Sequence, residues 1–159
     1  METQGRLIVD IARLDKEGER YEGELPSKIL DLDGNEILTP VGGVAYDLFI
    51  QLLGHELLVR GGLKQRLTCV CVRCAAAFES EVAEEAFTTC VQISDETDFL
   101  DLTEEAREAI ILALPGYPVC REDCKGLCAT CGANLNKKTC NCRKAAERDS
   151  QWAALDTLL

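Results

Sequence analysis

Apolar and polar side chains alternate through residues 44–70, the spacing expected of β-strands that bury one face. In the first of these strands, Asp47 and Gln51 lie on the polar side. The residues expected on its buried side are Tyr46, Leu48, Ile50 and Leu52. Glycines then divide the region, which predicts a turn at Gly54, a strand at 55–60, a turn at Gly61 and Gly62 and a strand at 63–70. The pattern predicts an antiparallel meander.

Three further segments have the composition of strands. Residues 6–14 and 20–26 are separated by a polar connection that contains Gly18, which predicts a hairpin. Residues 75–93 carry spaced apolar side chains among many acids. We interpret this segment as a strand, although its alanine and glutamate content also permits a helix.

Residues 102–115 have the boundaries of an α-helix. Thr103 is a favourable N-cap residue, two glutamates follow it in the first turn, and Pro115 is a stop signal. Ile110 and Leu112 are expected in the core with the strands. A second, short helix is predicted at the end of the chain, packed on the body through Trp152, Leu155, Leu158 and Leu159.

These segments predict an α+β fold, with a mainly antiparallel, barrel-like β meander, one or two helices and a C-terminal zinc knuckle. We divide the chain into an acidic β-rich body (1–115), a cysteine-rich zinc module (116–147) and a terminal helix (148–159). A chain of 159 residues is long enough to bury a hydrophobic core without crosslinks.

The net charge of −11 argues against a broad basic face that coats nucleic acid. The charge is unevenly distributed, because residues 120–148 carry seven basic and three acidic side chains and the remainder sums to −15. Any contact with RNA is therefore expected in the module. The candidate residues are Lys125, Lys137, Lys138, Arg143 and Lys144.

The first residues of the chain and the length of its apolar segments predict a cytoplasmic protein without a membrane partner. The first ten residues carry acids and no apolar run of a signal peptide. No stretch approaches the roughly 20 apolar residues that span a bilayer. In a reducing compartment, clustered cysteines are more often metal ligands or redox groups than disulfides.

Six of the ten cysteines lie within residues 120–142. Cys128 and Cys131 form a C-x-x-C pair followed by Gly132, which can adopt the positive φ of a zinc knuckle. The first predicted structural zinc site is Cys128, Cys131, Cys140 and Cys142. The second is Cys71, Cys74, Cys120 and Cys124, which would join the module to the end of the third strand. Spacing also permits Cys120 or Cys124 to replace Cys140 or Cys142.

The remaining candidates favour no catalytic site. Cys69 and Cys90 lack ligand spacing and are expected in the core. His55 is the single histidine and is expected to be a surface or packing residue. A zinc ion held by four thiolates has no open position for water, and we find no catalytic base, nucleophile motif or phosphate loop. We therefore expect no enzyme and no small-molecule substrate.

Three stretches together resemble one protein family. These are LTCVCVRCAAAF, then ILALPGYPVCREDCKGLCATCGANLNKKTCNC, then DSQWAALDTLL, within residues 40–159. They are similar to the YceD family of bacterial and plastid proteins, which are required for accumulation of large-subunit ribosomal RNA. The matching positions are Cys71, Arg73, Cys74, Pro115, Cys120, Cys124, Gly126, Leu127, Cys128, Cys131, Gly132, Asn134, Leu135, Asn136, Cys140 and Cys142. The departures are Ala129 for a common proline, Ser150 and Gln151 for a Pro-Arg pair, and the additional Cys69 and Cys90.

The resemblance implies a role in ribosome biogenesis. The leading hypothesis is a non-enzymatic factor that supports 23S rRNA accumulation, with ribosomal RNA or an assembly intermediate of the large subunit as its partner. The alternative is a zinc-stabilised adaptor whose acidic body binds a basic ribosomal protein. A third hypothesis is a thiol redox protein that uses Cys71 and Cys74, which would be free of metal.

Overall fold

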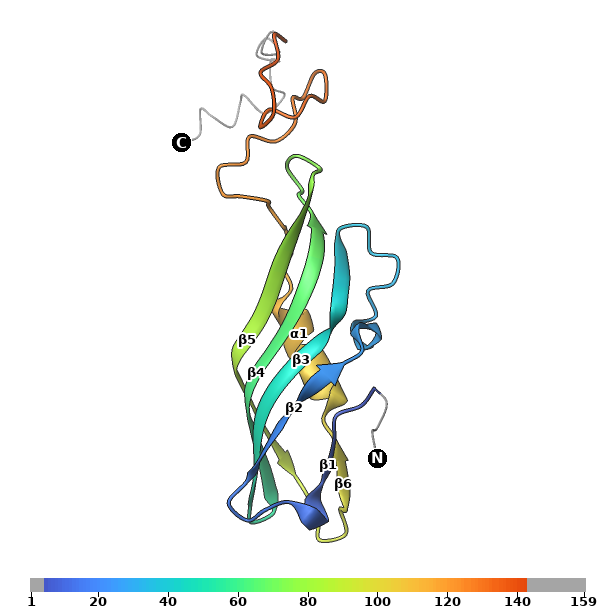
Figure 1. Ribbon diagram of the computed structural model, residues 1–159, viewed down its shortest axis with the longest axis vertical. Helices are drawn as coiled ribbons and strands as arrows, with labels where there is room; N and C mark the ends of the chain where they lie inside the picture. Colours follow the sequence, from blue (N-terminus) through green and yellow to red (C-terminus); the bar gives the residue numbers. More distant parts are fainter. Residues whose placement is uncertain (1–4, 143–159) are drawn as a thin grey trace, which may run out of the picture.

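The computed structural model describes residues 5–142, which form an elongated molecule around one antiparallel sheet (Figure 1). The sheet has four strands in the order β2-β3-β4-β5. Their bounds are Glu19–Leu25 for β2, Leu38–Leu53 for β3, Glu56–Val70 for β4 and Ala77–Gln92 for β5. Strands β3, β4 and β5 form an antiparallel meander, although its strands are not the three expected within residues 44–70, because 55–60 and 63–70 belong to the single strand β4. Residues 75–93 are confirmed as a strand rather than a helix.

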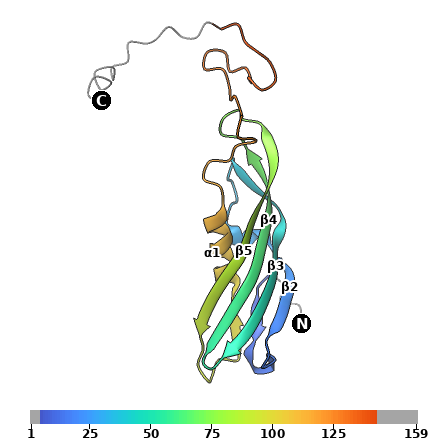
Figure 2. The ribbon, with the colours of Figure 1, turned by 90° about the vertical axis from the view of Figure 1, so that its left-hand side faces the viewer.

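A second, two-stranded sheet and three helical segments complete the fold. Strand β1 (Ile8–Asp10) pairs with β6 (Phe99–Asp101). The α-helix α1 spans Thr103–Ala113, and two short 3-10 helices span Ile11–Arg13 (η1) and Ser27–Leu30 (η2). Figure 2 shows α1 lying against one face of the larger sheet. The fold is therefore α+β, as the sequence predicts.

The core lies between the larger sheet and the elements that cover this face. The alternation of β3 places Leu48 and Ile50 there, and both side chains are fully buried. Helix α1 contributes Ala106 and Ile110, which pack in the same cluster. Leu112, expected in the core, is 79% exposed, because it follows Ile110 by two positions and so points away from the sheet.

The predicted barrel is not closed. Strands β2 and β5 lie at the two edges of the sheet and do not pair with each other among residues 5–142. The sheet is covered on one face by α1 rather than wrapped around its own core.

The predicted N-terminal hairpin is wrong. Residues 8–10 pair with 99–101, and β2 pairs instead with β3. The Asp10 side chain accepts a hydrogen bond from the Arg13 backbone N–H and caps η1. Ile11 then donates to the Asp98 carbonyl, so the chain is redirected before it can fold back on itself.

The predicted turn at Gly61 and Gly62 is also wrong, because β4 continues through both residues. The pairing with β5 shifts between Gly61 and Leu63, which marks a bulge. A Cβ atom on Gly61 would lie 2.1 Å from the carbonyl oxygen of Asp47 on β3. The glycine therefore permits a close approach of two strands, a role that sequence alone does not distinguish from a turn.

Helix α1 begins one residue earlier than the predicted cap requires. Leu102 occupies the N-cap position, and Thr103 is the first helical residue. The Thr103 hydroxyl accepts a hydrogen bond from the Leu7 backbone N–H at 2.9 Å, and Asp101 accepts one from the Thr103 N–H at 3.0 Å. The helix ends at Ala113, before Pro115 as predicted. The terminal helix predicted at 148–159 lies outside the described residues.

Among residues 5–142, no helix has both the length and the apolar content needed to cross a bilayer.

Candidate metal centres

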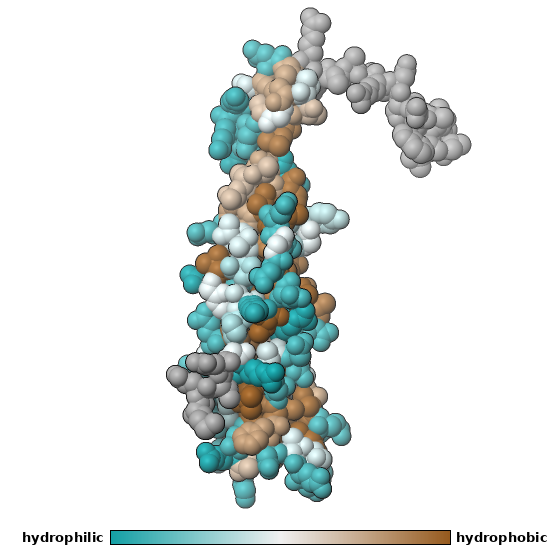
Figure 3. Space-filling view, turned by 90° about the vertical axis from the view of Figure 1, so that its right-hand side faces the viewer, coloured by the Kyte–Doolittle hydropathy of each residue, from teal (hydrophilic) through white to brown (hydrophobic). Residues whose placement is uncertain are grey.

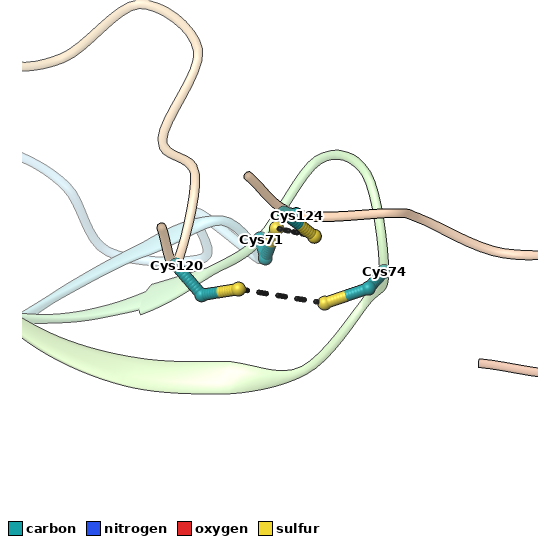
Figure 4. Close-up of side chains that lie close together, drawn as sticks. All are labelled: Cys71, Cys74, Cys120 and Cys124. Carbon is teal, nitrogen blue, oxygen red and sulfur yellow. Dashed lines mark hydrogen bonds between the residues drawn. The ribbon is translucent and has the colours of Figure 1, made fainter. Parts of the chain in front are cut away.

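Eight cysteines form two groups of four, with the four sulfur atoms of each group within 4.8 Å of one another. Centre 1 is Cys128, Cys131, Cys140 and Cys142. Centre 2 is Cys71, Cys74, Cys120 and Cys124 (Figure 4). The structure thus brings together the two groups that the spacing singled out, and it does not exchange Cys120 or Cys124 for Cys140 or Cys142.

Centre 2 is built from two distant parts of the chain. Cys71 follows the last residue of β4, and Cys74 lies in the connection to β5. Cys120 and Cys124 come from the segment after α1, which lies beside the tip of the β4–β5 hairpin (Figures 1 and 4). Three of the four cysteines are buried, so the cluster forms a small core of its own.

The sulfur spacing of centre 2 fits a tetrahedral metal ion. The Sγ atoms of Cys71 and Cys124 are 3.8 Å apart, and those of Cys74 and Cys120 are 3.7 Å apart. A tetrahedron with Zn–S bonds of about 2.3 Å has edges of about 3.8 Å. A disulfide requires a separation of about 2.05 Å. Four thiolates at this spacing could hold a metal ion.

The two C-x-x-C pairs have the same backbone geometry. The N–H of Ala75 donates to the Cys71 carbonyl at 2.8 Å, and the N–H of Gly132 donates to the Cys128 carbonyl at 2.8 Å. In return, Cys71 donates to the carbonyl of Ala76 at 2.9 Å, and Cys128 donates to that of Ala133 at 2.8 Å. Both pairs are therefore knuckles of one type.

Each knuckle needs a residue with positive φ after its second cysteine. Gly132 has a φ of 68°, as predicted for centre 1. In centre 2 the equivalent residue is Ala75, with a φ of 54°. Sequence reasoning did not identify this second knuckle, because an alanine carries no signal for the left-handed conformation.

The electrostatics of centre 2 favour a bound cation. Backbone N–H groups, first that of Cys120, hydrogen-bond to the Cys71 sulfur and lower the pKa of Cys71 to about 6. Burial and then the neighbouring thiols raise the pKa of Cys120 to about 12. Four adjacent sulfurs cannot all carry negative charge unless a cation offsets the repulsion.

The thiols of centre 1 also include one with a lowered pKa and one with a raised pKa. Backbone N–H groups of Cys131 and Thr130 lower the pKa of Cys128 to about 6. The neighbouring Cys131 thiol, with burial, raises the pKa of Cys142 to about 12. Centre 1 is more open than centre 2, since Cys131 is exposed and the other three ligands are half-buried.

The sequence profile described as "Large ribosomal RNA subunit accumulation protein YceD" matches residues 59–159, more than half of the chain. The chain belongs to the YceD family. The match includes all eight cysteines of the two centres, and it confirms the resemblance found in the three motifs.

Relatives extend the match in both bacteria and plants. An uncharacterized protein of Mycobacterium bovis is 29% identical over 174 residues, covering 96% of this chain and 81% of the relative. An uncharacterized protein of Mycobacterium leprae is 30% identical over 103 residues, covering 56% of this chain and 48% of the relative. The chloroplastic "Large ribosomal RNA subunit accumulation protein YCED homolog 1" of Arabidopsis thaliana is 36% identical over 59 residues, covering 37% and 18%. No solved structure matches significantly.

Cys69, Cys90 and His55 belong to neither centre. Cys69 is buried against Leu67 and Val82, as expected. Cys90 is exposed rather than in the core, because it lies on the face of β5 opposite to the buried Phe87. His55 is a surface residue, with Nδ1 3.4 Å from a carboxylate oxygen of Asp95.

Three of the five candidate RNA contacts are exposed in the module. Lys125 lies directly after a ligand of centre 2, and Lys137 and Lys138 lie in the loop between two ligands of centre 1. Arg143 and Lys144 lie outside the described residues. Arg73 is a matching family position and not one of these candidates. Its guanidinium donates to the backbone carbonyls of Glu122 and Cys124.

Sequence reasoning assigned no role to two asparagines of the centre 1 loop. Asn134 donates to the Cys74 carbonyl at 3.4 Å, and Asn136 donates to the Cys124 sulfur at 3.3 Å. Burial would raise the pKa of Cys124, but N–H donors from Gly126 and Asn136 outweigh it and the pKa is lowered. The available signal was a repeated asparagine between cysteines, although spacing alone did not show that the side chains reach the other centre.

Proposed function

We propose that this protein is a non-enzymatic factor that supports accumulation of 23S rRNA during biogenesis of the large ribosomal subunit. The observation that carries the proposal is membership of the YceD family, whose description is "Large ribosomal RNA subunit accumulation protein YceD". Plant relatives in Arabidopsis thaliana and Zea mays carry the same description. The site of action proposed for this chain is the cytoplasm.

The arrangement of charge supports the module as the RNA-binding part. Lys125, Lys137 and Lys138 are exposed, and the two centres hold their backbone in defined loops beyond the end of an acidic sheet (Figure 1). Lysines on a fixed loop can neutralise phosphates, while the acidic body discourages non-specific binding elsewhere. On the face drawn in Figure 3, hydrophobic residues are interspersed with hydrophilic ones.

The proposed metal is zinc in a structural role. Four thiolates at tetrahedral spacing are the ligand set that zinc prefers, and such a site has no open position for substrate. In this proposal the ions fold the module and take no part in catalysis.

The test is to delete the gene and to compare ribosomal particles and 23S rRNA precursor with wild type. The expected result is a loss of large subunits, restored by the intact gene. A rescue variant with Lys125, Lys137 and Lys138 all changed to alanine is expected to restore less. The matched control changes Lys16, Lys28 and Lys64, three exposed body lysines, and alters the total charge equally. Unchanged large-subunit levels after deletion would contradict the proposal.

The second candidate is an adaptor that binds a basic ribosomal protein. It is favoured by a groove of about 430 Å³ between α1 and β5. Its walls include the carboxylates Glu84, Glu105 and Glu108 beside the apolar Phe87 and Leu112. Crosslinking that recovers ribosomal protein but no RNA, and that is lost when the three glutamates become glutamine, would favour this candidate.

A further inference from the structure

Asn136 belongs to the loop of one centre and contacts the sulfur of the other. It lies between Cys131 and Cys140, two ligands of centre 1. Its side-chain Nδ2 nevertheless donates to the Sγ atom of Cys124 in centre 2 at 3.3 Å. The two centres are therefore joined by a hydrogen bond to a ligand atom.

The orientation of this amide is fixed by its other partners. Oδ1 accepts from the Lys125 backbone N–H at 2.9 Å and from the Arg121 guanidinium at 2.7 Å. Nδ2 also donates to the Asn134 Oδ1 atom at 3.0 Å. Backbone N–H and guanidinium groups can only donate, so the oxygen must face them and the NH₂ group must face Cys124. All four hydrogen-bonding positions of the amide are used.

The backbone around Asn136 is also held against centre 2. Leu127 donates to the Arg73 carbonyl at 3.0 Å, and Leu135 donates to the Gly126 carbonyl at 3.0 Å. The Asn136 N–H donates to the Asn134 side chain at 2.9 Å. These bonds give the loop one defined position on centre 2 once its ends are closed. Its ends are Cys131 and Cys140, both ligands of centre 1.

We propose that Asn136 couples the two centres, so that a metal ion in centre 1 tightens binding of a metal ion in centre 2. The ion in centre 1 closes the loop and holds the Asn136 NH₂ group on the Cys124 sulfur. An N–H donor disperses the charge of a metal-bound thiolate and fixes its direction, and outer-shell partners of this kind typically change metal affinity 10- to 100-fold. Because coupling is reciprocal, an ion in centre 2 also tightens centre 1. The inference requires both clusters to bind metal, and it is independent of any role in rRNA accumulation.

The experiment measures release of Zn²⁺ from the full chain to a chromophoric chelator, after metal content per chain has been determined. A variant with Cys131→Ser and Cys142→Ser keeps centre 2 alone and identifies its release phase. In this variant, centre 2 is expected to release zinc about 10- to 100-fold faster than in the intact chain. Asn136→Ala in the intact chain is expected to accelerate the same phase by a similar factor. Combining Asn136→Ala with the cysteine changes is expected to increase the release rate by less than about a further twofold, because both changes remove the same interaction.

Two further variants separate the hydrogen bond from general damage to the loop. Asn136→Asp keeps an acceptor for Lys125 but places an oxygen against the Cys124 sulfur, so it is expected to accelerate release at least as much as Asn136→Ala. Asn141→Ala changes an exposed asparagine between two ligands of centre 1 and is expected to leave centre 2 unchanged. The proposal is overturned if Asn136→Ala and Asn136→Asp both release centre 2 zinc at the wild-type rate. It is also overturned if the effects of Asn136→Ala and the cysteine changes multiply, or if centre 2 binds no zinc in the wild-type chain.

Discussion

Cys71 and Cys124 are 53 positions apart in the chain, yet their sulfur atoms lie 3.8 Å from each other. Cys71 follows β4 and Cys124 follows α1, and the strands β5 and β6 lie between them in the chain with that helix. A metal ion bound by both would close a long loop, which removes more entropy from the unfolded chain than a local knuckle does. Centre 2 thereby connects the tip of the β4–β5 hairpin to the segment that carries centre 1.

Ala75→Gly is predicted to stabilise the knuckle of centre 2. Ala75 has a φ of 54°, a conformation that turns the chain so that the Ala76 carbonyl accepts from the Cys71 backbone N–H at 2.9 Å. Left-handed backbone costs a residue with a Cβ about 1 kcal/mol, which glycine avoids. Denaturant unfolding of the zinc-loaded chain should show a gain of this order. The matched control is Ala76→Gly, where φ is not positive and a loss of about 0.5–1 kcal/mol is expected. Equal effects at both positions would contradict the assignment.

Gly61→Ala is predicted to destabilise the sheet by about 2–4 kcal/mol, from overpacking and from its positive φ. Its Cβ would lie 2.1 Å from the Asp47 carbonyl oxygen, and its φ is 153°. Gly62→Ala is the control, because its Cβ would meet only ordinary contacts, the nearest at 3.7 Å. Thermal unfolding of both variants checks the prediction, which fails if the two changes cost the same.

Metal affinity at centre 2 is predicted to depend on pH with a change of slope near pH 6. Burial and neighbouring thiols raise the pKa of Cys120 to about 12, so metal binding must displace a proton from it at neutral pH. N–H donors, first that of Cys120, lower the pKa of Cys71 to about 6. This thiolate is therefore present above pH 6 and is lost as the pH falls through 6, so one further proton must then be displaced. The apparent affinity for Zn²⁺ should fall with decreasing pH and fall more steeply below about pH 6.

The measurement is competition with a chelator of known affinity between about pH 5 and about pH 8 on the variant that keeps centre 2 alone. A constant slope across this range would contradict the assignment of a thiolate to Cys71.

The sequence predicted what depends on local spacing. Alternation in residues 44–53 placed Leu48 and Ile50 on the buried face, and cysteine spacing grouped all eight ligands. The strand face and each cysteine pair depend on residues a few positions apart. Cys71 and Cys74 were grouped with Cys120 and Cys124 only because these were the two remaining pairs, and the fold brings them together across the chain. The prediction that Cys90 lies in the core was based on residue type alone. The register of β5 on β4, which the sequence pattern did not supply, instead leaves its side chain exposed.

The features that were missed depend on contacts between distant segments. The partner of residues 8–10 is β6, some ninety positions later, and no local pattern specifies this pairing. Gly61 is a residue type typical of turns, but here it is needed because the backbone of the neighbouring strand leaves no room for a Cβ atom. Asn136 reaches centre 2 only because the knuckles fold the chain back on itself. Tertiary contacts of this kind override local propensity.

Cys131→Ser removes a ligand of centre 1 only, and it is predicted to expose residues 125–142 to protease while centre 2 and the body stay folded. Apart from its cysteines, this segment has only four other apolar residues, Leu127, Ala129, Ala133 and Leu135, and Leu127 is 43% exposed. Burial of so few side chains contributes far less than structural zinc, whose apparent binding energy is on the order of 10 kcal/mol in small modules. The body has its own core, with Leu48, Ile50 and Ile110 fully buried.

Trypsin is a suitable probe of this variant, because Lys125, Lys137 and Lys138 are exposed cleavage sites within the module. Limited digestion of Cys131→Ser should cut there first and leave a resistant body that unfolds cooperatively on heating. Cys90→Ser is the control, since Cys90 is exposed and belongs to neither centre, and it should digest like wild type. If Cys131→Ser instead unfolds as one unit with the sheet, the module is an integral part of the core. The division of the chain into an acidic body and a metal-dependent module would then be wrong.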